Sequence, residues 1–222
     1  MIYISLCSSL DAKKEYEIGT DLIKCFGKEA DLRLEKISSA SSLYLSFGGL
    51  LALKSLTNKF ISGNADLSVA YGEFGKPFFK SLKLPFSISH TGSLSVAALE
   101  NEYESPIGVD IELIDKRRNL KQIAERFFLE YELSSLKEHD YSADEFYKLW
   151  TSKEAYVKLC GTSLSSILGK SDTVKLCSDK TIFFTHLKIK YDGDEYILTV
   201  AATNKTNTEI FDMSKDLEIK II

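Results

Sequence analysis

The strongest constraint on the fold of this chain is an order of predicted elements that occurs twice. In each half a strand-like apolar run comes first, helical segments follow and end in a long helix, and extended runs close the half. The first half predicts extended runs at Ile2–Cys7, Leu67–Tyr71, Pro85–Ser89 and Leu94–Glu100, helical segments through the thirties, and a long helix at Ser41–Asn58. The second half predicts extended runs at Ile107–Ile114, Thr173–Leu176, Thr181–Lys190 and Tyr196–Ala202, short helices at Leu120–Phe128 and Tyr131–His139, and a long helix at Asp144–Leu159.

A short sequence likeness accompanies this repeat. Ser95–Ala98 and Thr199–Ala202 share the last three of their four residues and occupy comparable places in the two halves. Two related halves tend to bind ligands in the cleft between them. We therefore predict an α+β fold with halves at residues 1–104 and 105–222, related by a pseudo-twofold, each a small, mainly antiparallel sheet packed with helices.

Composition limits the class of protein. Of the 222 residues, 44% are hydrophobic and 27% are charged, which is typical of a globular chain. The net charge of −4 gives no basic surface for nucleic acid. The N-terminal residues lack the pattern of a signal peptide, and the apolar segment Leu43–Leu53 is too short to span a bilayer. We expect a cytoplasmic protein that binds neither nucleic acid nor a membrane.

The cysteines do not predict a structural site. Cys7, Cys25, Cys160 and Cys177 are widely separated and form no CxxC pair. We therefore expect no zinc site and no disulfide, and we interpret all four as buried, reduced thiols.

Two carboxylates alternate within the apolar run Ile107–Ile114. Because alternate side chains of a strand share a face, Asp110 and Glu112 should point the same way. Such a pair could lie on a solvated strand face. Here the strand follows directly after the extended run Leu94–Glu100, and we expect it to be central in its sheet. Buried acids then require a cation or a partner, and oxygen ligands of this kind suit Mg²⁺.

A second charged pair lies on the predicted helix Asp144–Leu159. Glu154 and Lys158 are one turn apart, so their side chains can lie side by side. An exposed pair of this spacing would contribute only a few tenths of a kcal/mol. Trp150 precedes Glu154 by one turn and favours a packed face. If this helix meets the acidic strand, three carboxylates converge beside a lysine, which would form a hard-cation site next to a phosphate-binding group.

Other patterns are weak or absent. The sequence contains no GxxxxGK[ST] loop, no GxGxxG and no GxSxG. His90 lies in a turn between two extended runs and Lys76 lies in a Gly-Lys-Pro turn, and either residue could be structural.

In order and spacing, several segments together resemble the large, monomeric, surfactin-synthetase-activating class of 4′-phosphopantetheinyl transferases. The segments that match lie between about Gly72 and Leu164: Gly75–Pro77, Phe86–Gly92, Ile107–Glu112, Arg126–Phe128 and Leu149–Lys158. The pair of motifs GxDxE and WxxKExxxK is the most specific part of the resemblance.

The resemblance implies a reaction and its residues. Phosphopantetheine would pass from coenzyme A to a serine of an apo acyl or peptidyl carrier protein, releasing adenosine 3′,5′-bisphosphate. The resemblance implies that Asp110, Glu112 and Glu154 bind Mg²⁺, and that Lys158 contacts the diphosphate and assists the leaving group. Lys76, Ser89 and His90 would bind coenzyme A. Glu132, Glu154 or a metal-bound water would remove the serine proton.

The N-terminal third departs from the family pattern. Members carry basic residues before the first long helix and an arginine near its start, facing the 3′-phosphate of coenzyme A. This chain has Tyr44 near the expected arginine, and Arg33 and Lys36 are the nearest basic residues. Two alternatives to the transferase stay open: a Mg²⁺-dependent diphosphate hydrolase that uses the same acids, and a non-catalytic binding protein.

Overall fold

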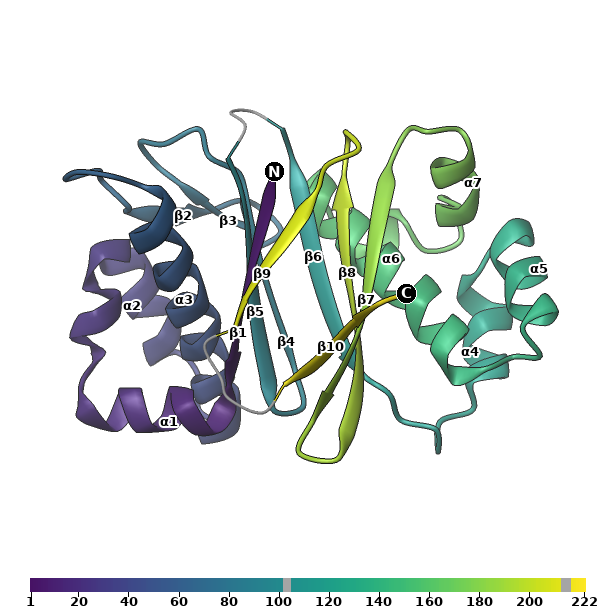
Figure 1. The fold of residues 1–222 in the computed structure, drawn as a ribbon, viewed down its shortest axis with the longest axis horizontal. Coiled ribbons are helices and arrows are strands. Elements are labelled where there is room, and N and C mark those ends of the chain that lie inside the picture. The colour runs from purple at the N-terminus through teal and green to yellow at the C-terminus, as the bar shows by residue number, and fades with distance from the viewer. Residues whose placement is uncertain (102–104, 213–216) are drawn as a thin grey trace.

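Figure 1 shows the computed structural model, in which residues 1–101, 105–212 and 217–222 are described. The helices are α1 (Ser9–Ile18), α2 (Lys28–Glu35), α3 (Ala40–Phe60), α4 (Leu120–Phe127), α5 (Glu130–Glu138), α6 (Ala143–Cys160) and α7 (Thr173–Ser178), with short 3-10 segments η1 (Thr20–Phe26) and η2 (Leu164–Ser166). The strands are β1 (Ile2–Ser8), β2 (Val69–Tyr71), β3 (Pro77–Phe79), β4 (Phe86–Thr91), β5 (Leu94–Glu100), β6 (Ile107–Leu113), β7 (Phe183–Tyr191), β8 (Asp194–Ala202), β9 (Thr208–Asp212) and β10 (Glu218–Ile221).

The two larger sheets repeat one pairing scheme. Their strand orders are β4-β5-β1-β9 and β10-β7-β8-β6, and β2 pairs with β3 in a small separate sheet. In the first sheet β1 pairs antiparallel with β5, which pairs antiparallel with β4, and in the second sheet β6 pairs antiparallel with β8, which pairs antiparallel with β7. The predicted α+β class, with small and mainly antiparallel sheets packed with helices, is confirmed. The pseudo-twofold and the division at residues 104/105 stay predictions.

Apolar residues of the two sheets form a shared core. Alternate side chains of β1 and β5 pack together with alternate side chains of β6, β7 and β8, among them Ile4, Val96, Val109 and Leu198. The opposite face of the first sheet packs against α3, and that of the second against α6. Helices α1 to α3 therefore lie on one side of the strands and α4 to α7 on the other, as Figure 1 shows.

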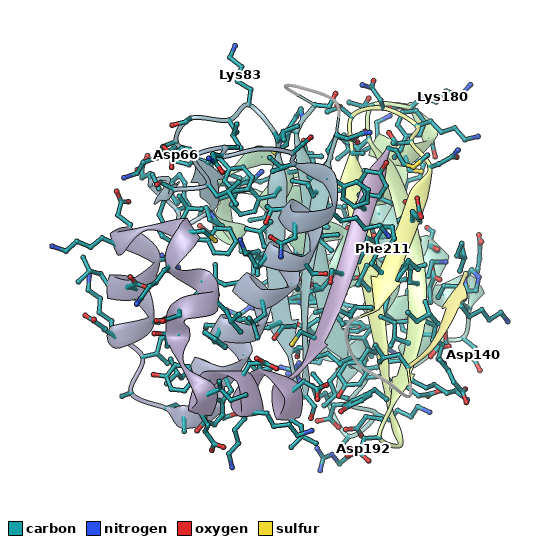
Figure 2. The ribbon with its side chains drawn as sticks, turned by 60° about the vertical axis from the view of Figure 1, so that its left-hand side comes forward. Asp66, Lys83, Asp140, Lys180, Asp192 and Phe211 are labelled. Atoms are coloured by element: carbon teal, nitrogen blue, oxygen red, sulfur yellow. The ribbon has the colours of Figure 1, made fainter. Side chains whose placement is uncertain are left out.

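Strand β9 belongs to the second half of the sequence but pairs with the first sheet. It runs parallel to β1, with Ile4 opposite Ile210. Figure 2 shows Phe211 on this strand, beside β1. The Phe211 ring packs at 5.4 Å from the ring of Phe60 at the end of α3. The two sheets are thus joined by a strand as well as by their common core.

Helix α6, which carries two predicted site residues, has well-defined ends. The Ser142 hydroxyl accepts a hydrogen bond from the amide of Glu145, and two acids in the first turn suit the positive end of the helix dipole. The helix ends at Gly161, whose φ of 62° lies in the left-handed region that glycine adopts at little cost.

Three expectations from the sequence were wrong. Strand β6 is at the edge of its sheet, because it pairs with β8, whose sequence lies far along the chain, and not with β5. Residues 173–178 form helix α7 although Thr173 and Val174 are β-branched, because the Asp172 side chain caps the first turn. The cysteines are all free, but Cys7 alone is buried, since Cys160 and Cys177 are exposed and Cys25 is half-buried.

The pattern of extended runs was also incomplete, because β3, β9 and β10 were not predicted. Across the described ranges, every helix is too short or too polar to cross a lipid bilayer.

Candidate functional site

Gly108 allows α6 to lie directly on β6. A side chain at this position would overlap the backbone of Ala155 and Leu159, so the motif requires glycine there. Because β-strand side chains alternate, Asp110 and Glu112 share the face of Gly108, whereas Val109 and Ile111 enter the shared core. The acids of β6 therefore point toward the helix that carries Glu154 and Lys158.

Hydroxyl side chains of β4 bind β6 where the two sheets meet. The Ser87 hydroxyl accepts a hydrogen bond from the Val109 amide at 3.0 Å. The Ser89 hydroxyl donates to Asp110 Oδ1 at 2.8 Å, and the Thr91 hydroxyl donates to Glu112 Oε2 at 3.2 Å. These side-chain contacts connect two edge strands and fix the orientation of both acids.

Lys158 lies on Asp110. Its Nζ is 2.7 Å from Asp110 Oδ1 and 2.6 Å from the Ser89 hydroxyl. The Asp110 side chain is 5% exposed and that of Lys158 is 27% exposed. The second carboxylate oxygen, Asp110 Oδ2, is buried without a hydrogen-bond partner. A buried carboxylate oxygen in that state is costly unless a further ligand binds it.

The acids of the site carry more negative charge than Lys158 neutralises. Burial first, and then the charges of Asp110 and Glu154, raise the pKa of Glu112 to about 7, against the opposing effects of the Thr91 hydrogen bond and Lys158. Burial and the charge of Asp110 likewise raise the pKa of Glu154. The three carboxylates are thus close enough to repel one another, which favours a bound cation.

A cavity of about 370 Å³ contains these groups. Its lining residues come from both halves of the chain: Ala30, Arg33, Leu34, Ile37, Ser46, Leu50, Tyr71, Gly75, Pro77, Ile88, Ser89, His90, Asp110, Glu112, Glu154 and Lys158. A second cavity of about 340 Å³ shares Glu154 and Lys158 with the first. The structure therefore brings the three acids, Lys158, Ser89 and His90 to one cavity.

The donor set fits a hard divalent cation. Carboxylate oxygens are the ligands that Mg²⁺ prefers, and Asp110 Oδ2 has no other partner. In the present side-chain arrangement, no three His, Cys, Asp or Glu residues of the described ranges are positioned to bind one metal ion directly. The Lys158 ammonium occupies the other oxygen of Asp110. Assignment of Asp110, Glu112 and Glu154 as metal ligands stays a prediction.

Part of this chain is similar to proteins of a known family. A sequence profile of the 4′-phosphopantetheinyl transferase superfamily matches residues 106–201, which run from β6 to β8. The chain is 36% identical to a Bacillus subtilis 4′-phosphopantetheinyl transferase over 63% of this chain and 65% of the relative. It is 35% identical to 4′-phosphopantetheinyl transferase Sfp of Bacillus subtilis strain 168, over 60% of this chain and 58% of the relative. The segment from β6 to β8 is thus similar to the 4′-phosphopantetheinyl transferase superfamily.

The superfamily match is limited in extent. A third relative, 4′-phosphopantetheinyl transferase AcpT of Escherichia coli K12, is 34% identical over 52% of this chain and 64% of its own length. The chain thus covers less than two thirds of each of these relatives. The matched superfamily segment includes all three acids and Lys158, while the part of the cavity that α2 and α3 form lies outside it.

Lys76 lies next to the main cavity and not in its lining. It lines the second cavity, and its Nζ donates to the backbone oxygens of Ile107 at 3.0 Å and Leu159 at 3.3 Å. Burial lowers the pKa of Lys76 to about 8. The lysine therefore joins the β2–β3 turn to the start of β6 and the end of α6.

Glu132 is not brought to the cavity. It is fully buried among α5, α6 and α7, where Oε2 accepts from the Leu129 amide and Oε1 accepts from the amide and the hydroxyl of Thr173. Oε2 also pairs with Lys153 Nζ at 2.8 Å. This carboxylate stabilises helix starts, and we do not assign it the role of a catalytic base.

Some cavity residues had no predicted role. Thr91 and Ser87 hold the acidic strand, and their alternation with Ser89 along β4 was a signal in the sequence that all three hydroxyls share a face. Tyr71 and Ser46 line the cavity without any local pattern that would have indicated it.

Proposed function

We propose that this protein transfers the 4′-phosphopantetheine group of coenzyme A to a serine of an apo acyl or peptidyl carrier protein, in a Mg²⁺-dependent reaction. The observation that supports this most is the convergence of Asp110, Glu112, Glu154 and Lys158 in one cavity within the segment that matches the superfamily. Relatives that carry the name 4′-phosphopantetheinyl transferase support the same activity.

The transfer breaks one phosphorus–oxygen bond and forms another. The serine oxygen of the carrier attacks the phosphorus that bears the pantetheine arm. The bond from that phosphorus to the bridging oxygen breaks, and adenosine 3′,5′-bisphosphate leaves with that oxygen. The serine proton goes to a base in the site, and the leaving oxygen acquires negative charge.

In this proposal Lys158 stabilises that charge. Its Nζ contacts Asp110 and Ser89 in the cavity lining, and the Lys158 side chain remains 27% exposed to an incoming ligand. An ammonium group in a partly dry cavity stabilises a developing anion more than water does, and it can also protonate the leaving oxygen.

The acids have complementary roles in this proposal. Asp110, Glu112 and Glu154 would hold Mg²⁺, which would supply charge neutralisation on the diphosphate when bound. Glu154, whose pKa is raised by burial and by Asp110, is also a candidate for accepting the serine proton. Ser89 and His90 of β4, which line the cavity, would contact coenzyme A.

The direct test is a mass measurement on carrier proteins. Purified protein, Mg²⁺ and coenzyme A should increase the mass of an apo carrier by one phosphopantetheine. A carrier whose acceptor serine is replaced by alanine is the matched control and should not change. An unchanged mass for fatty-acid, polyketide and peptide-synthetase carriers would contradict the proposal. Coenzyme A cleavage without any carrier would instead indicate a diphosphate hydrolase.

A further inference from the structure

Each acid of β6 is held by one hydroxyl of β4, through one of its two carboxylate oxygens. The Ser89 hydroxyl donates to Asp110 Oδ1 at 2.8 Å. Two residues further on, the Thr91 hydroxyl donates to Glu112 Oε2 at 3.2 Å. Because the contacts advance by two residues on both strands, β4 and β6 run side by side in the same direction, although they belong to different sheets. The first half of the chain thus supplies the groups that orient the acids of the second half.

The two acids differ in how many groups hold them. Asp110 Oδ1 contacts the Lys158 ammonium as well as Ser89. Within the described ranges, Thr91 supplies the only hydrogen bond to the Glu112 carboxylate. A glutamate side chain also has one more rotatable bond than an aspartate side chain, so more conformational freedom must be restricted to hold it. The orientation of Glu112 therefore depends on Thr91 alone.

Thr91 lies behind Glu112 as seen from the cavity. Glu112 is one of the lining residues of the cavity that contains the three acids, whereas Thr91 is not among them. The Thr91 side chain is half-buried at the end of β4. It can therefore influence a ligand in this cavity only through the carboxylate that it holds.

The turn after Thr91 is fixed to the second sheet. Gly92 has a φ of 54°, and a Cβ there would lie 3.1 Å from the Tyr196 ring. The side chain of Tyr196 is fully buried, and its hydroxyl accepts a hydrogen bond from the Ser93 amide at 3.4 Å. Tyr196 is on β8, opposite the residue that follows Glu112 on β6. The turn thus rests on the part of the second sheet that carries Glu112, which fixes the separation of Thr91 and Glu112.

We propose that Thr91 is a positioning residue of the cation site. By holding one oxygen of Glu112 it leaves the other oxygen oriented for a divalent cation, and the contact of Gly92 and Ser93 with Tyr196 holds Thr91 in place. This inference rests on the proposed function, because it takes Glu112 as a ligand of the cation. Partners that orient a metal-binding carboxylate are typically worth about 10- to 100-fold in metal affinity or activity.

The test measures cation binding directly. Mn²⁺ is the probe, because it accepts the same oxygen ligands as Mg²⁺ and its free form is quantified by electron paramagnetic resonance. The titration contains coenzyme A and no carrier, with coenzyme A alone as the blank. Thr91→Val keeps the size of the side chain and removes its hydroxyl, so it should weaken Mn²⁺ binding about tenfold. Thr91→Ser keeps the hydroxyl and should bind Mn²⁺ within about twofold of the unaltered protein.

Two buried tyrosines provide a matched comparison. Tyr196→Phe removes the hydroxyl that accepts from Ser93 and should weaken Mn²⁺ binding about threefold. Tyr147 is also buried, and its hydroxyl accepts from the Asp115 amide at 3.1 Å, away from the cavity lining. Tyr147→Phe should leave the affinity for Mn²⁺ unchanged. Both variants lose one hydrogen bond to a backbone amide, so their melting temperatures should fall by similar amounts.

Carrier modification supplies a second measurement. For Thr91→Val, the Mg²⁺ concentration that gives half the maximal rate should rise about tenfold. The kcat at saturating Mg²⁺ and the KM for the carrier should change by less than about twofold. A residue that only stabilised the fold would not shift the Mg²⁺ dependence alone. Thr91→Ala, which also lacks the hydroxyl, replaces Thr91→Val in both measurements if the valine variant does not fold.

The outcomes separate this inference from the proposed function. Mn²⁺ binding that is unchanged in Thr91→Val, or weakened as much in Thr91→Ser, would overturn the role of Thr91. Equal weakening by Tyr147→Phe and Tyr196→Phe would overturn it too, and carrier modification in the mass assay would still support the transferase. Mn²⁺ binding that depends on the Thr91 hydroxyl, in a protein that modifies no carrier, would support the positioning role and contradict the proposed function. An unaltered protein that binds no Mn²⁺ would contradict the cation site itself.

Discussion

Two lysines of helix α6 each pair with an acid of another element, and the two pairs are equally short but differ in burial and in hydrogen bonding. Lys153 Nζ lies 2.8 Å from Glu132, and Lys158 Nζ lies 2.7 Å from Asp110. Both side chains of the first pair are fully buried, and Lys153 also donates to the Ser171 carbonyl. The second pair faces a cavity, and one oxygen of Asp110 has no partner.

The comparison shows how to separate a structural ion pair from a functional one. Both oxygens of Glu132 are hydrogen-bonded within the protein, so this group has no capacity left for a ligand. Asp110 retains that capacity, and its neighbours Glu112 and Glu154 have raised pKa values. Unused hydrogen-bonding capacity beside a cavity therefore indicates a candidate ligand site, whereas a short ion-pair distance does not.

The largest expected effect comes from removing the carboxylates of the cavity that contains the Lys158–Asp110 pair. Asp110→Ala and Glu154→Ala should each lower kcat/KM for carrier modification by at least about a thousandfold, because in the proposed function each removes a ligand of the same cation. The double variant should be little worse than either single one. Rates come from the mass assay, and circular dichroism should show a retained fold.

A matched control for this effect lies on the same helix. Asp144 pairs with Lys188 at the start of α6, outside the cavity, so Asp144→Ala should leave the rate within about twofold of the unaltered protein. Losses for Asp110→Ala and Glu154→Ala that add up in the double variant would argue against a shared ion.

The second largest effect comes from breaking the buried pair of Lys153 and Glu132. Lys153→Met should lower the free energy of unfolding by about 3 kcal/mol, because it leaves the Glu132 carboxylate buried without its cation. The double variant Glu132→Gln, Lys153→Met should recover part of this loss. Urea denaturation measures both, and Lys158→Met is the comparison, with a smaller expected loss because the Lys158 side chain is 27% exposed and Asp110 keeps its hydrogen bond from Ser89.

This second test also bears on catalysis. The folded fraction of Lys153→Met should modify carriers at a rate close to normal. A rate as low as that of Asp110→Ala, at unchanged stability, would mean that the buried pair takes part in the reaction after all.

The smallest expected effect tests the role of Lys158, the lysine that lines the cavity. Lys158→Ala should lower the turnover number about a hundredfold, the scale of lost general-acid or electrostatic assistance, with little change in the KM for the carrier. Steady-state kinetics at varied carrier concentration separates these two quantities. A change confined to the KM for the carrier would place Lys158 in carrier binding.

Much of the architecture followed from local sequence patterns. The alternating run that became β6 and the apolar stretch that became α3 were predicted within a few residues. From the sequence it stayed open whether the acidic strand β6 and helix α6 meet. They do meet, and glycine at position 108 permits this close contact.

Sequence patterns did not reveal the long-range partners. Whether β6 is central or at an edge depends on β8, far along the chain, and the local run does not encode that choice. The place of Glu132 depends on Thr173 and on the helix that Asp172 starts. The place of Arg33 depends on Tyr71, which approaches α2 only after the chain has folded.

Strand β9 also limits how the molecule can be divided. A fragment that ends near residue 104 would expose the backbone hydrogen-bonding groups of β1 that β9 covers in the intact chain. Bare strand edges recruit other strands, so such a fragment should self-associate when expressed alone. Two separately produced pieces should instead assemble with each other, with β9 completing the sheet of the other piece.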